Sequence, residues 1–261
     1  MPELPEVEAY RRLAERALGR PIVHVDAPDE WFLKGGSTSP AVVAALRGRT
    51  FTAARRVGKL LLLDTSEAGP VLGLRFGMTG RLLVDGTAGV DVLLYTSDRE
   101  LEAWDRFAVR FEDGGDLRVR DPRRLGGVLL DPDEGLLGPD ALGVSPAALR
   151  AALAGSDAPL KARLMDQARL AGVGNLIADE ALWRAGLAPT RAAGSLSAAE
   201  LRRLHRHLRS TLDDLIGRGG SHRGDLMAER RPGGVCPRDG APLQRSTVGG
   251  RTSWWCPRHQ G

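Results

Sequence analysis

The sequence is poor in cysteine and has no long apolar run, and both shortages exclude classes of protein. Only Cys236 and Cys256 occur among the 261 residues, so the fold cannot depend on a disulfide framework. No apolar run approaches the ~20 residues that a membrane-spanning helix needs. The acidic, polar N-terminus lacks the features of a signal peptide. We therefore expect a cytoplasmic protein with no membrane partner.

Lysine is also scarce, and charge is unevenly distributed. Residues 1–159 contain 20 Lys and Arg against 24 Asp and Glu, whereas residues 160–261 contain 17 against 9. The basic C-terminal part predicts a polyanionic partner, with DNA or RNA first; a merely solvated basic surface is the alternative. Only Lys34, Lys59 and Lys161 are lysines. Lysine, unlike arginine, is a compact charge that titrates readily.

The chain begins Met1-Pro2-Glu3, and removal of Met1 would leave Pro2 with a free secondary amine. An α-amino group has a pKa near ~7.8, against ~10.4 for a lysine side chain, so roughly a tenth of it is neutral at pH 7. A neutral amine can attack a sugar C1′ and form an iminium. Glu3 is one residue away and could move protons. A proline with no chemical role is the alternative.

The first half of the chain is predicted to be mainly β-structure. Residues 5–18 have the apolar stripe of a helix, which would anchor the N-terminus. From about 21 to 130 the pattern is mostly strand, and the alternation across 107–119 around a Gly-Gly turn predicts an antiparallel hairpin. These features favour a β-sandwich. Residues 131–145 are rich in Pro, Gly and acidic residues and are interpreted as a linker.

After this linker the pattern becomes helical. Ser145 and Pro146 are typical of a helix start, with the serine as cap. Ser197 and Glu200 form a capping box, and a leucine stripe follows it to Gly217. Together these signals predict at least two helices, the second of them long.

Gly172 and Gly174 interrupt an amphipathic pattern, and a new helix is predicted near Asn175. Glycines allow close approach of a partner, and a helix N-terminus presents N–H groups that suit a phosphate. Asn175 could donate to the same phosphate. A tight packing turn between core helices is the alternative.

The C-terminus has the spacing of a zinc ribbon. Cys236 and Asp239, then Cys256 and His259, form two pairs separated by a hairpin length. Cysteine, aspartate and histidine all bind zinc, which predicts one structural zinc. The alternative is a ribbon without metal. Arg251 would project from the tip of the hairpin.

The segment from Asp121 to Leu125 follows a predicted strand. Arg123 and Arg124 could hold phosphates or an orphaned base, and Leu125 could wedge into the base stack. An ordinary exposed loop explains the same residues.

These motifs together resemble the formamidopyrimidine-DNA glycosylase/endonuclease VIII family. The match runs from the start PELPEVE, through LMDQ…AGVGN…ADEAL, to the C-terminal ribbon, and the start is closer to the formamidopyrimidine branch. The resemblance implies Pro2 as nucleophile, Glu3 as acid/base, and Lys59 as a contact to the phosphate by the lesion. It further implies Met78 in the void left by the flipped nucleotide, Arg123 and Leu125 as the other intercalating residues, Asn175 and Arg251 as a phosphate clamp, and Glu6 near the base pocket.

The sequence departs from the family pattern in four places. Arg75-Phe76 stands where His-Leu is usual, and Leu125 replaces a phenylalanine. Asp239 and His259 replace two zinc cysteines. Only fourteen residues separate Ser221 from Cys236, and in the family this stretch carries the loop that closes over 8-oxoguanine. The last departure weakens the expectation of oxidised-purine specificity.

We therefore expect an α+β protein, with an N-terminal antiparallel β-sandwich and a C-terminal helical part that contains a helix–two-turn–helix and a zinc-ribbon hairpin. The expected domains are residues 1–130, 146–231 and 232–261, joined by the linker 131–145. The expected function is a bifunctional DNA glycosylase/AP lyase that acts on damaged double-stranded DNA as a monomer near the bacterial nucleoid, without a nucleotide or redox cofactor. Two alternatives stay open: oxidised pyrimidines as substrates, and a non-catalytic protein that binds lesions or crosslinks.

Overall fold

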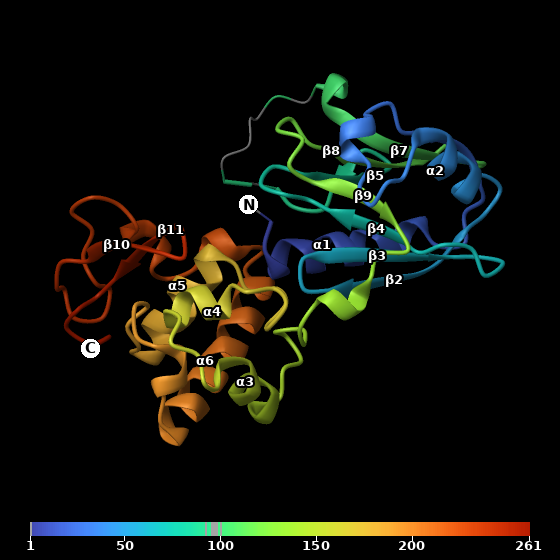
Figure 1. Cartoon of the computed structure of the whole chain (residues 1–261). Coiled ribbons are helices and arrows are strands. Elements are labelled where there is room, and N and C mark those ends of the chain that lie inside the picture. The colour runs from blue at the N-terminus through green and yellow to red at the C-terminus, as the bar shows by residue number, and fades with distance from the viewer. Residues whose placement is uncertain (1, 92, 95–98, 100) are drawn as a thin grey trace. The chain divides into compact units, whose positions relative to one another are not determined.

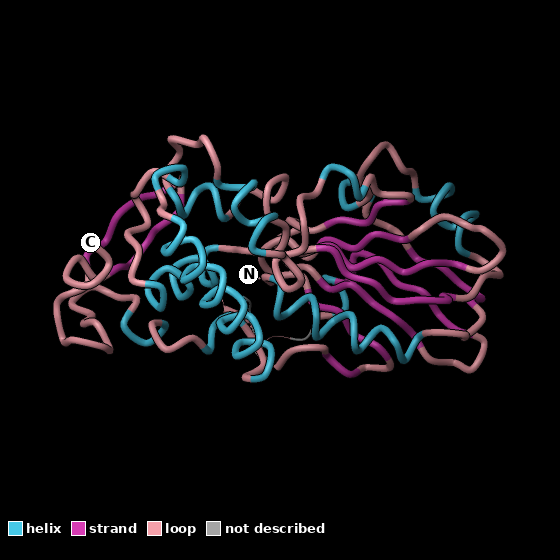
Figure 2. Tube along the Cα trace, turned by 90° about the horizontal axis from the view of Figure 1, so that it is seen from below, coloured by secondary structure: helices cyan, strands magenta, loops and turns pink. Residues whose placement is uncertain are grey.

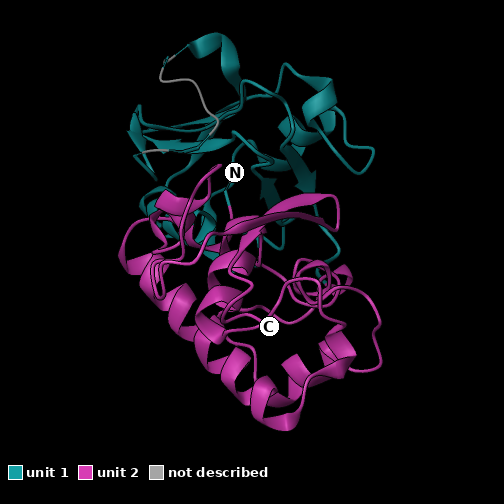
Figure 3. Ribbon diagram, turned by 90° about the vertical axis from the view of Figure 1, so that its left-hand side faces the viewer, with its two compact units in different colours: residues 1–2, 6–134 teal, residues 3–5, 135–261 magenta. Residues whose placement is uncertain are grey.

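The computed structural model describes residues 2–91, 93, 94, 99 and 101–261. The chain divides into two compact units (Figure 3). The first contains residues 1–2 and 6–134, and the second contains residues 3–5 and 135–261. Three residues from the extreme N-terminus therefore belong to the C-terminal unit. Strands dominate the first unit and helices the second (Figure 2), which confirms the predicted α+β class.

The first unit begins with the predicted N-terminal helix. Helix α1 spans Leu4–Ala14, and a 3-10 turn at Glu15–Ala17 extends it. Val7, Tyr10 and Ala14 are fully buried along one face, as the apolar stripe predicted. A second helix, α2 (Ser39–Leu46), was not predicted, although Thr38 caps it by accepting from the Ala41 N–H.

Among the described residues of this unit, nine strands form two antiparallel sheets. Figure 1 shows both sheets. The four-stranded sheet has the order β2 (Phe51–Val57), β3 (Leu60–Thr65), β4 (Leu72–Arg75), β9 (Gly127–Leu130). The five-stranded sheet has the order β1 (Ile22–Asp26), β7 (Asp105–Phe111), β8 (Asp116–Arg120), β5 (Arg81–Val84), β6 (Thr87–Ala88). The predicted hairpin is β7–β8. Short 3-10 turns lie at Glu30–Phe32 and Glu102–Trp104.

One buried cluster joins the two sheets. It takes Leu61 and Leu74 from the four-stranded sheet and Phe107 and Val119 from the five-stranded sheet. Tyr10 also belongs to it, and its hydroxyl donates to the Gly80 carbonyl at 3.1 Å. Both sheets thus bury one face in a common core, as a sandwich requires.

The second unit is built from four helices and a C-terminal hairpin. The helices are α3 (Pro146–Leu153), α4 (Leu160–Leu164), α5 (Asn175–Ala185) and α6 (Ala198–Gly217), and the hairpin strands are β10 (Gln244–Val248) and β11 (Arg251–Trp255). Short 3-10 turns lie at Glu134–Leu136, Ala193–Ser195, Ser221–Arg223 and Met227–Glu229. No helix within the described residues is both long enough and apolar enough to cross a bilayer.

The predicted start signals of α3 and α6 are confirmed. Ser145 accepts from the Ala148 N–H at the start of α3. At α6, Ser197 and Glu200 form the reciprocal capping box, whose serine is worth about 1 kcal/mol. The predicted leucine stripe of α6 is buried against the other helices.

Much of the predicted linker packs onto the second unit. The Gly138 N–H donates to the Gln167 carbonyl, and the Ala141 N–H donates to the Ala171 carbonyl, both at 2.9 Å. The unit boundary falls between Glu134 and Gly135. A separation of the second unit into a helical domain and a ribbon domain stays a proposal.

Candidate active site and metal centre

The carboxylate of Glu3 is held by the first turn of α5. Its Oε1 accepts from the Leu176 N–H at 2.9 Å, and its Oε2 accepts from the Ile177 N–H at 3.1 Å. N–H groups of a first turn have no partner within their helix, and the positive end of the helix dipole favours an anion there. Glu3 is fully buried, so these bonds replace water that the carboxylate has lost.

Gly174 makes room for this carboxylate. A Cβ atom at Gly174 would lie 2.2 Å from Glu3 Cδ and 2.5 Å from both carboxylate oxygens. The close approach at Gly174 is thus to a carboxylate of the chain itself, and not to another helix as the packing alternative supposed. The first turn of α5 has given two of its N–H groups to a side chain of the same unit, and these two are not open to a phosphate.

Pro2 and Glu6 lie on either side of this anchored segment. The Leu4 N–H donates to the Gly172 carbonyl at 3.3 Å, so the backbone after Glu3 is fixed as well. Pro2 directly precedes Glu3 and is buried. Glu6 lies in the first turn of α1 and is 1% exposed. Anchoring Glu3 thus restrains the position of the proline nitrogen.

Lys59 lies in the tight turn between β2 and β3 and is half-buried. Arg56 holds this turn by donating to the Gly58 carbonyl at 3.0 Å, and it also donates to Glu8 of α1 at 3.0 Å. Burial raises the pKa of Glu8, but hydrogen bonds from Arg56 and Arg11 outweigh it and keep that pKa below its ordinary value. The ionised Glu8 therefore connects α1 to the Lys59 turn.

The residues expected to enter the duplex lie on two loops of the first unit. Met78, between β4 and β5, is half-buried, and Leu125, between β8 and β9, is 50% exposed. Arg123 and Arg124 are exposed. Arg124 pairs with Asp29 through two hydrogen bonds of 2.7 and 2.5 Å, so this arginine already has an internal partner.

Asn175 and Arg251, the expected phosphate clamp, both belong to the second unit. Asn175 is the first residue of α5, and its Oδ1 is buried without a hydrogen-bond partner among the described residues. Arg251 is the first residue of β11 and is exposed beside the Gly249–Gly250 turn. The exposed Arg251 guanidinium can donate to a phosphate, whereas Asn175 would have to use its amide N–H₂ group, because Oδ1 is an acceptor.

A buried ionic cluster fastens the hairpin of Arg251 to α5. Asp179 pairs with Lys161 at 2.8 Å and with Arg230, and it accepts from the Ser253 hydroxyl at 2.6 Å. Lys161 also donates to the Thr252 carbonyl at 3.0 Å. Burial lowers the pKa of Lys161, although Asp179 opposes that shift. The cluster contains charges from α4, α5 and the 221–235 stretch, so it fixes all three to β11.

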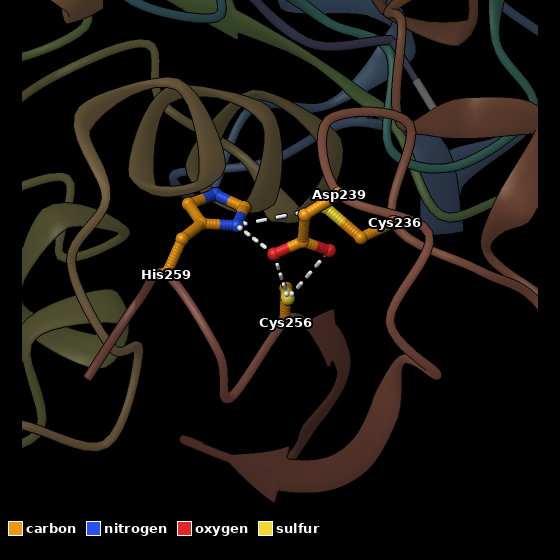
Figure 4. A group of neighbouring side chains, drawn as sticks. All are labelled: Cys236, Asp239, Cys256 and His259. Atoms are coloured by element: carbon orange, nitrogen blue, oxygen red, sulfur yellow. Dashed lines mark hydrogen bonds and ion pairs between the residues drawn. The ribbon is translucent and has the colours of Figure 1, made fainter.

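The four predicted metal ligands converge in the ribbon (Figure 4). The ligand atoms of Cys236, Asp239, Cys256 and His259 lie within 4.8 Å of one another. Cys236 Sγ is 3.5 Å from His259 Nδ1, Cys256 Sγ is 3.5 Å from the nearer Asp239 oxygen, and His259 Nδ1 is 3.6 Å from that carboxylate. Zinc bonds of about 2.0–2.3 Å place tetrahedral ligands roughly 3.3–3.8 Å apart, so these three separations and the donor types are compatible with a zinc ion.

Groups around these ligands favour metal binding further. His259 Nε2 lies 3.1 Å from the Trp183 carbonyl, which favours a proton on Nε2 and leaves Nδ1 to face the other ligands. The Trp183 indole N–H and the Arg238 N–H approach Cys236 Sγ at 3.3 and 3.4 Å. N–H donors of this kind stabilise a thiolate, the form of cysteine that binds metal.

Four structural residues were not singled out from the sequence. Arg56, Asp121, Asp179 and Glu180 all make contacts to residues distant in the chain. Only Glu180 had a local signal, because Arg184 follows it four residues later on the same helix face. The contacts of Arg56, Asp121 and Asp179 are to residues far away along the chain, and no local sequence pattern indicates such contacts.

Comparisons with known proteins agree with this architecture. The family model described as the formamidopyrimidine-DNA glycosylase N-terminal domain matches residues 1–128, and the one described as the formamidopyrimidine-DNA glycosylase H2TH domain matches residues 137–225. A formamidopyrimidine-DNA glycosylase of Paracoccus denitrificans is 36% identical over 285 residues and covers 98% of this chain and 99% of that protein. One from Stenotrophomonas maltophilia is 36% identical over 287 residues and covers 100% of both chains.

Solved structures show the same likeness. Lactococcus lactis Fpg in complex with abasic-site DNA superposes with a TM-score of 0.82 at 26% identity, covering 99% of each chain. The same protein with Fapy-dG DNA also gives a TM-score of 0.82 at 26% identity and 99% coverage of each chain.

Proposed function

The chain belongs to the formamidopyrimidine-DNA glycosylase family of bifunctional DNA glycosylase/AP lyases of base excision repair, and we propose that Pro2 is its nucleophile and Glu3 its acid/base. The observation that carries this proposal is the buried Glu3 carboxylate at the N-terminus of α5, directly beside Pro2. A carboxylate that accepts from two backbone N–H groups is oriented before substrate arrives. An N-terminal amine next to it can act as nucleophile near neutral pH.

The chemistry follows from these two groups. The Pro2 nitrogen attacks C1′ of the damaged nucleotide and loses its proton, the glycosidic bond breaks, and the base departs with a proton. The C1′–O4′ bond then opens, O4′ takes up a proton to become a hydroxyl, and the nitrogen lone pair forms the iminium to C1′. The resulting iminium acidifies the C2′ protons, so a base can remove one and expel the 3′ phosphate. A second elimination releases the 5′ phosphate. Glu3 is the proposed proton carrier in these steps.

The proposed DNA contacts use the remaining site residues. Lys59 would bind the phosphate beside the lesion, and Asn175 and Arg251 would bind neighbouring phosphates. Met78, Arg123 and Leu125 would occupy the space of the flipped nucleotide. Arg124 would contact DNA after exchanging its pairing with Asp29, and Glu6 would lie near the base. The solved relatives in complex with abasic-site and Fapy-dG DNA support damaged duplex DNA as the partner. We further propose a monomer near the bacterial nucleoid.

The non-catalytic alternative is disfavoured. A protein that only binds lesions has no need of an N-terminal proline followed by a carboxylate that is held in place by two backbone N–H groups. The matched relatives are named as glycosylases rather than as binding proteins.

The stretch 221–235 supports a substrate class other than 8-oxoguanine. Glu180 accepts from the Asp225 N–H at 3.1 Å and from the Leu226 N–H at 3.0 Å. Leu226 is fully buried, and Arg230 pairs with Asp179. The stretch is thus short and fastened to α5, which leaves little chain for a lid. The 287-position alignment with the Stenotrophomonas protein exceeds the 261 residues here, so that relative has residues with no counterpart in this chain.

The metal proposal is one structural zinc held by Cys236, Asp239, Cys256 and His259. When bound, zinc would cross-link the two ends of the ribbon without taking part in the reaction. Its proposed effect on DNA binding is indirect: it stabilises the hairpin that carries Arg251.

Borohydride reduction of the enzyme with an abasic duplex should trap a covalent adduct on the N-terminal peptide, because only an iminium is reduced to a stable amine. Mass spectrometry locates the adduct. Pro2→Gly should retain an amine but work more slowly, and protein that keeps Met1 should not be trapped. An adduct on Lys59, or none at all, would contradict the assignment of Pro2.

Abasic sites and ring-opened or saturated bases should be processed faster than 8-oxoguanine paired with cytosine. Without a lid, discrimination of 8-oxoguanine depends on one or two hydrogen bonds of ~1–3 kcal/mol each. Single-turnover rates on matched duplexes with abasic, dihydrouracil, formamidopyrimidine and 8-oxoguanine sites measure the preference. If 8-oxoguanine is cleaved at least as fast as the other three, the substrate proposal is wrong.

Purified protein should contain about one zinc per chain by elemental analysis, and Cys256→Ser should lose the metal. This variant should also lose DNA binding while hydrogen exchange in β7 and β8 stays unchanged. Thr247→Ser, at an exposed position of the same hairpin, is the matched control and should keep both metal and DNA binding. Less than about 0.2 zinc per chain, without exposure to chelator, would argue strongly against the metal site.

A further inference from the structure

The two loops of the first unit that carry Met78 and Leu125 rest directly on each other. Gly77 has a left-handed backbone with φ of 54°, and a Cβ atom there would lie 2.4 Å from the Leu125 carbonyl carbon. The same atom would be 2.6 Å from the Gly126 nitrogen. The loop of Met78 therefore packs against the backbone of the loop of Leu125, and a displacement of either loop must move the other.

One buried carboxylate joins these loops. Asp121 is fully buried, and its Oδ1 accepts from the Thr79 hydroxyl at 2.5 Å and from the Arg123 N–H at 3.1 Å. Its Oδ2 accepts from the Gly126 N–H at 2.8 Å. Thr79 directly follows Met78, whereas Arg123 and Gly126 bracket Leu125. A single side chain thus binds one loop on one side and both ends of the other loop.

Asp121 is itself fixed to β7 and to the 3-10 turn that precedes it. Its N–H donates to the Trp104 carbonyl at 2.9 Å, and its carbonyl accepts from Arg106 Nε at 2.9 Å. The loop that it holds contains Arg124 in the left-handed conformation, with φ of 57°. This conformation is unfavourable for a residue with a side chain. The two bonds from Arg123 and Gly126 to Asp121 enclose the strained residue and oppose its relaxation.

We propose that Asp121 is a positioning residue that holds Met78 and Leu125 as one rigid wedge, ready to occupy the space of the flipped nucleotide. The inference rests on the function proposed above for these two side chains. Asp121 is buried beneath the loops and touches no reacting atom. Asp121 therefore affects the step in which the wedge enters the duplex. It does not affect the reaction of Pro2 with a sugar that is already outside a base stack.

A pair of substrates separates these two steps. The first is a duplex with a central abasic site, whose sugar must leave the helix before reaction. The second is the same abasic strand alone, which contains no stack to open. Single-turnover nicking rates are measured on both substrates, and 2-aminopurine fluorescence opposite the lesion reports entry of the wedge.

Three variants test the carboxylate and its hydroxyl partner. Asp121→Asn replaces one acceptor by a donor, so it cannot serve all three groups. Thr79→Val keeps the shape but removes the bond that joins the loops, and Thr79→Ser restores the hydroxyl. Thr211→Val, at a fully buried threonine of α6 whose hydroxyl has no partner among the described residues, is the matched control. If Asp121→Asn fails to fold, Thr79→Val still tests the hydrogen bond that joins the two loops.

Asp121→Asn and Thr79→Val should slow nicking of the duplex by about 10- to 100-fold, as expected for loss of a hydrogen bond to a charged group. Both should weaken the 2-aminopurine signal and leave the single-strand rate within about twofold of wild type. Thr79→Ser and Thr211→Val should behave like wild type. Equal losses on both substrates, or no loss on the duplex, would overturn the proposal. Failure of the wild-type enzyme to form any trapped adduct would instead contradict the role of Pro2.

Discussion

The hydrogen bonds between the Glu3 carboxylate and the first turn of α5 are the interaction on which the proposed catalytic arrangement depends. They place the N-terminal residues 3–5 in the second unit, although α1 continues into the first. A free amine at a chain end would normally be among the least ordered parts of a protein. Here Glu3, the residue next to the proposed nucleophile, is buried and hydrogen-bonded, so Pro2 is already ordered before substrate binds.

Helix α5 extends this organisation through the second unit. Its N-terminus holds Glu3, Asp179 in its middle holds the hairpin of Arg251, and Glu180 holds the stretch that follows Ser221. All three carboxylates are buried and satisfied by hydrogen bonds, as buried charges must be. One short helix therefore connects the proposed proton carrier, the hairpin of the proposed phosphate clamp and the short stretch 221–235.

The sequence was sufficient for features that depend on local pattern. The capping box at Ser197, the stripe of α6 and the β7–β8 hairpin are all local signals, and the structure contains them. Helix α2 was missed because its surroundings were dominated by strand patterns. Asp121 and Asp179 were missed because their partners lie 42 and 74 residues away along the chain. The resemblance to a family supplied candidate site residues, whereas the contacts that position them required the fold.

Substitution of Gly174 tests the central claim, the anchoring of Glu3, most directly. In Gly174→Ala the new Cβ would displace the Glu3 carboxylate, so hydrogen exchange at the Leu176 and Ile177 amides should accelerate and abasic-site cleavage should fall by about tenfold or more. Gly143→Ala, where a Cβ meets nothing within 4 Å, should change neither. Unchanged exchange and cleavage in Gly174→Ala would contradict the account.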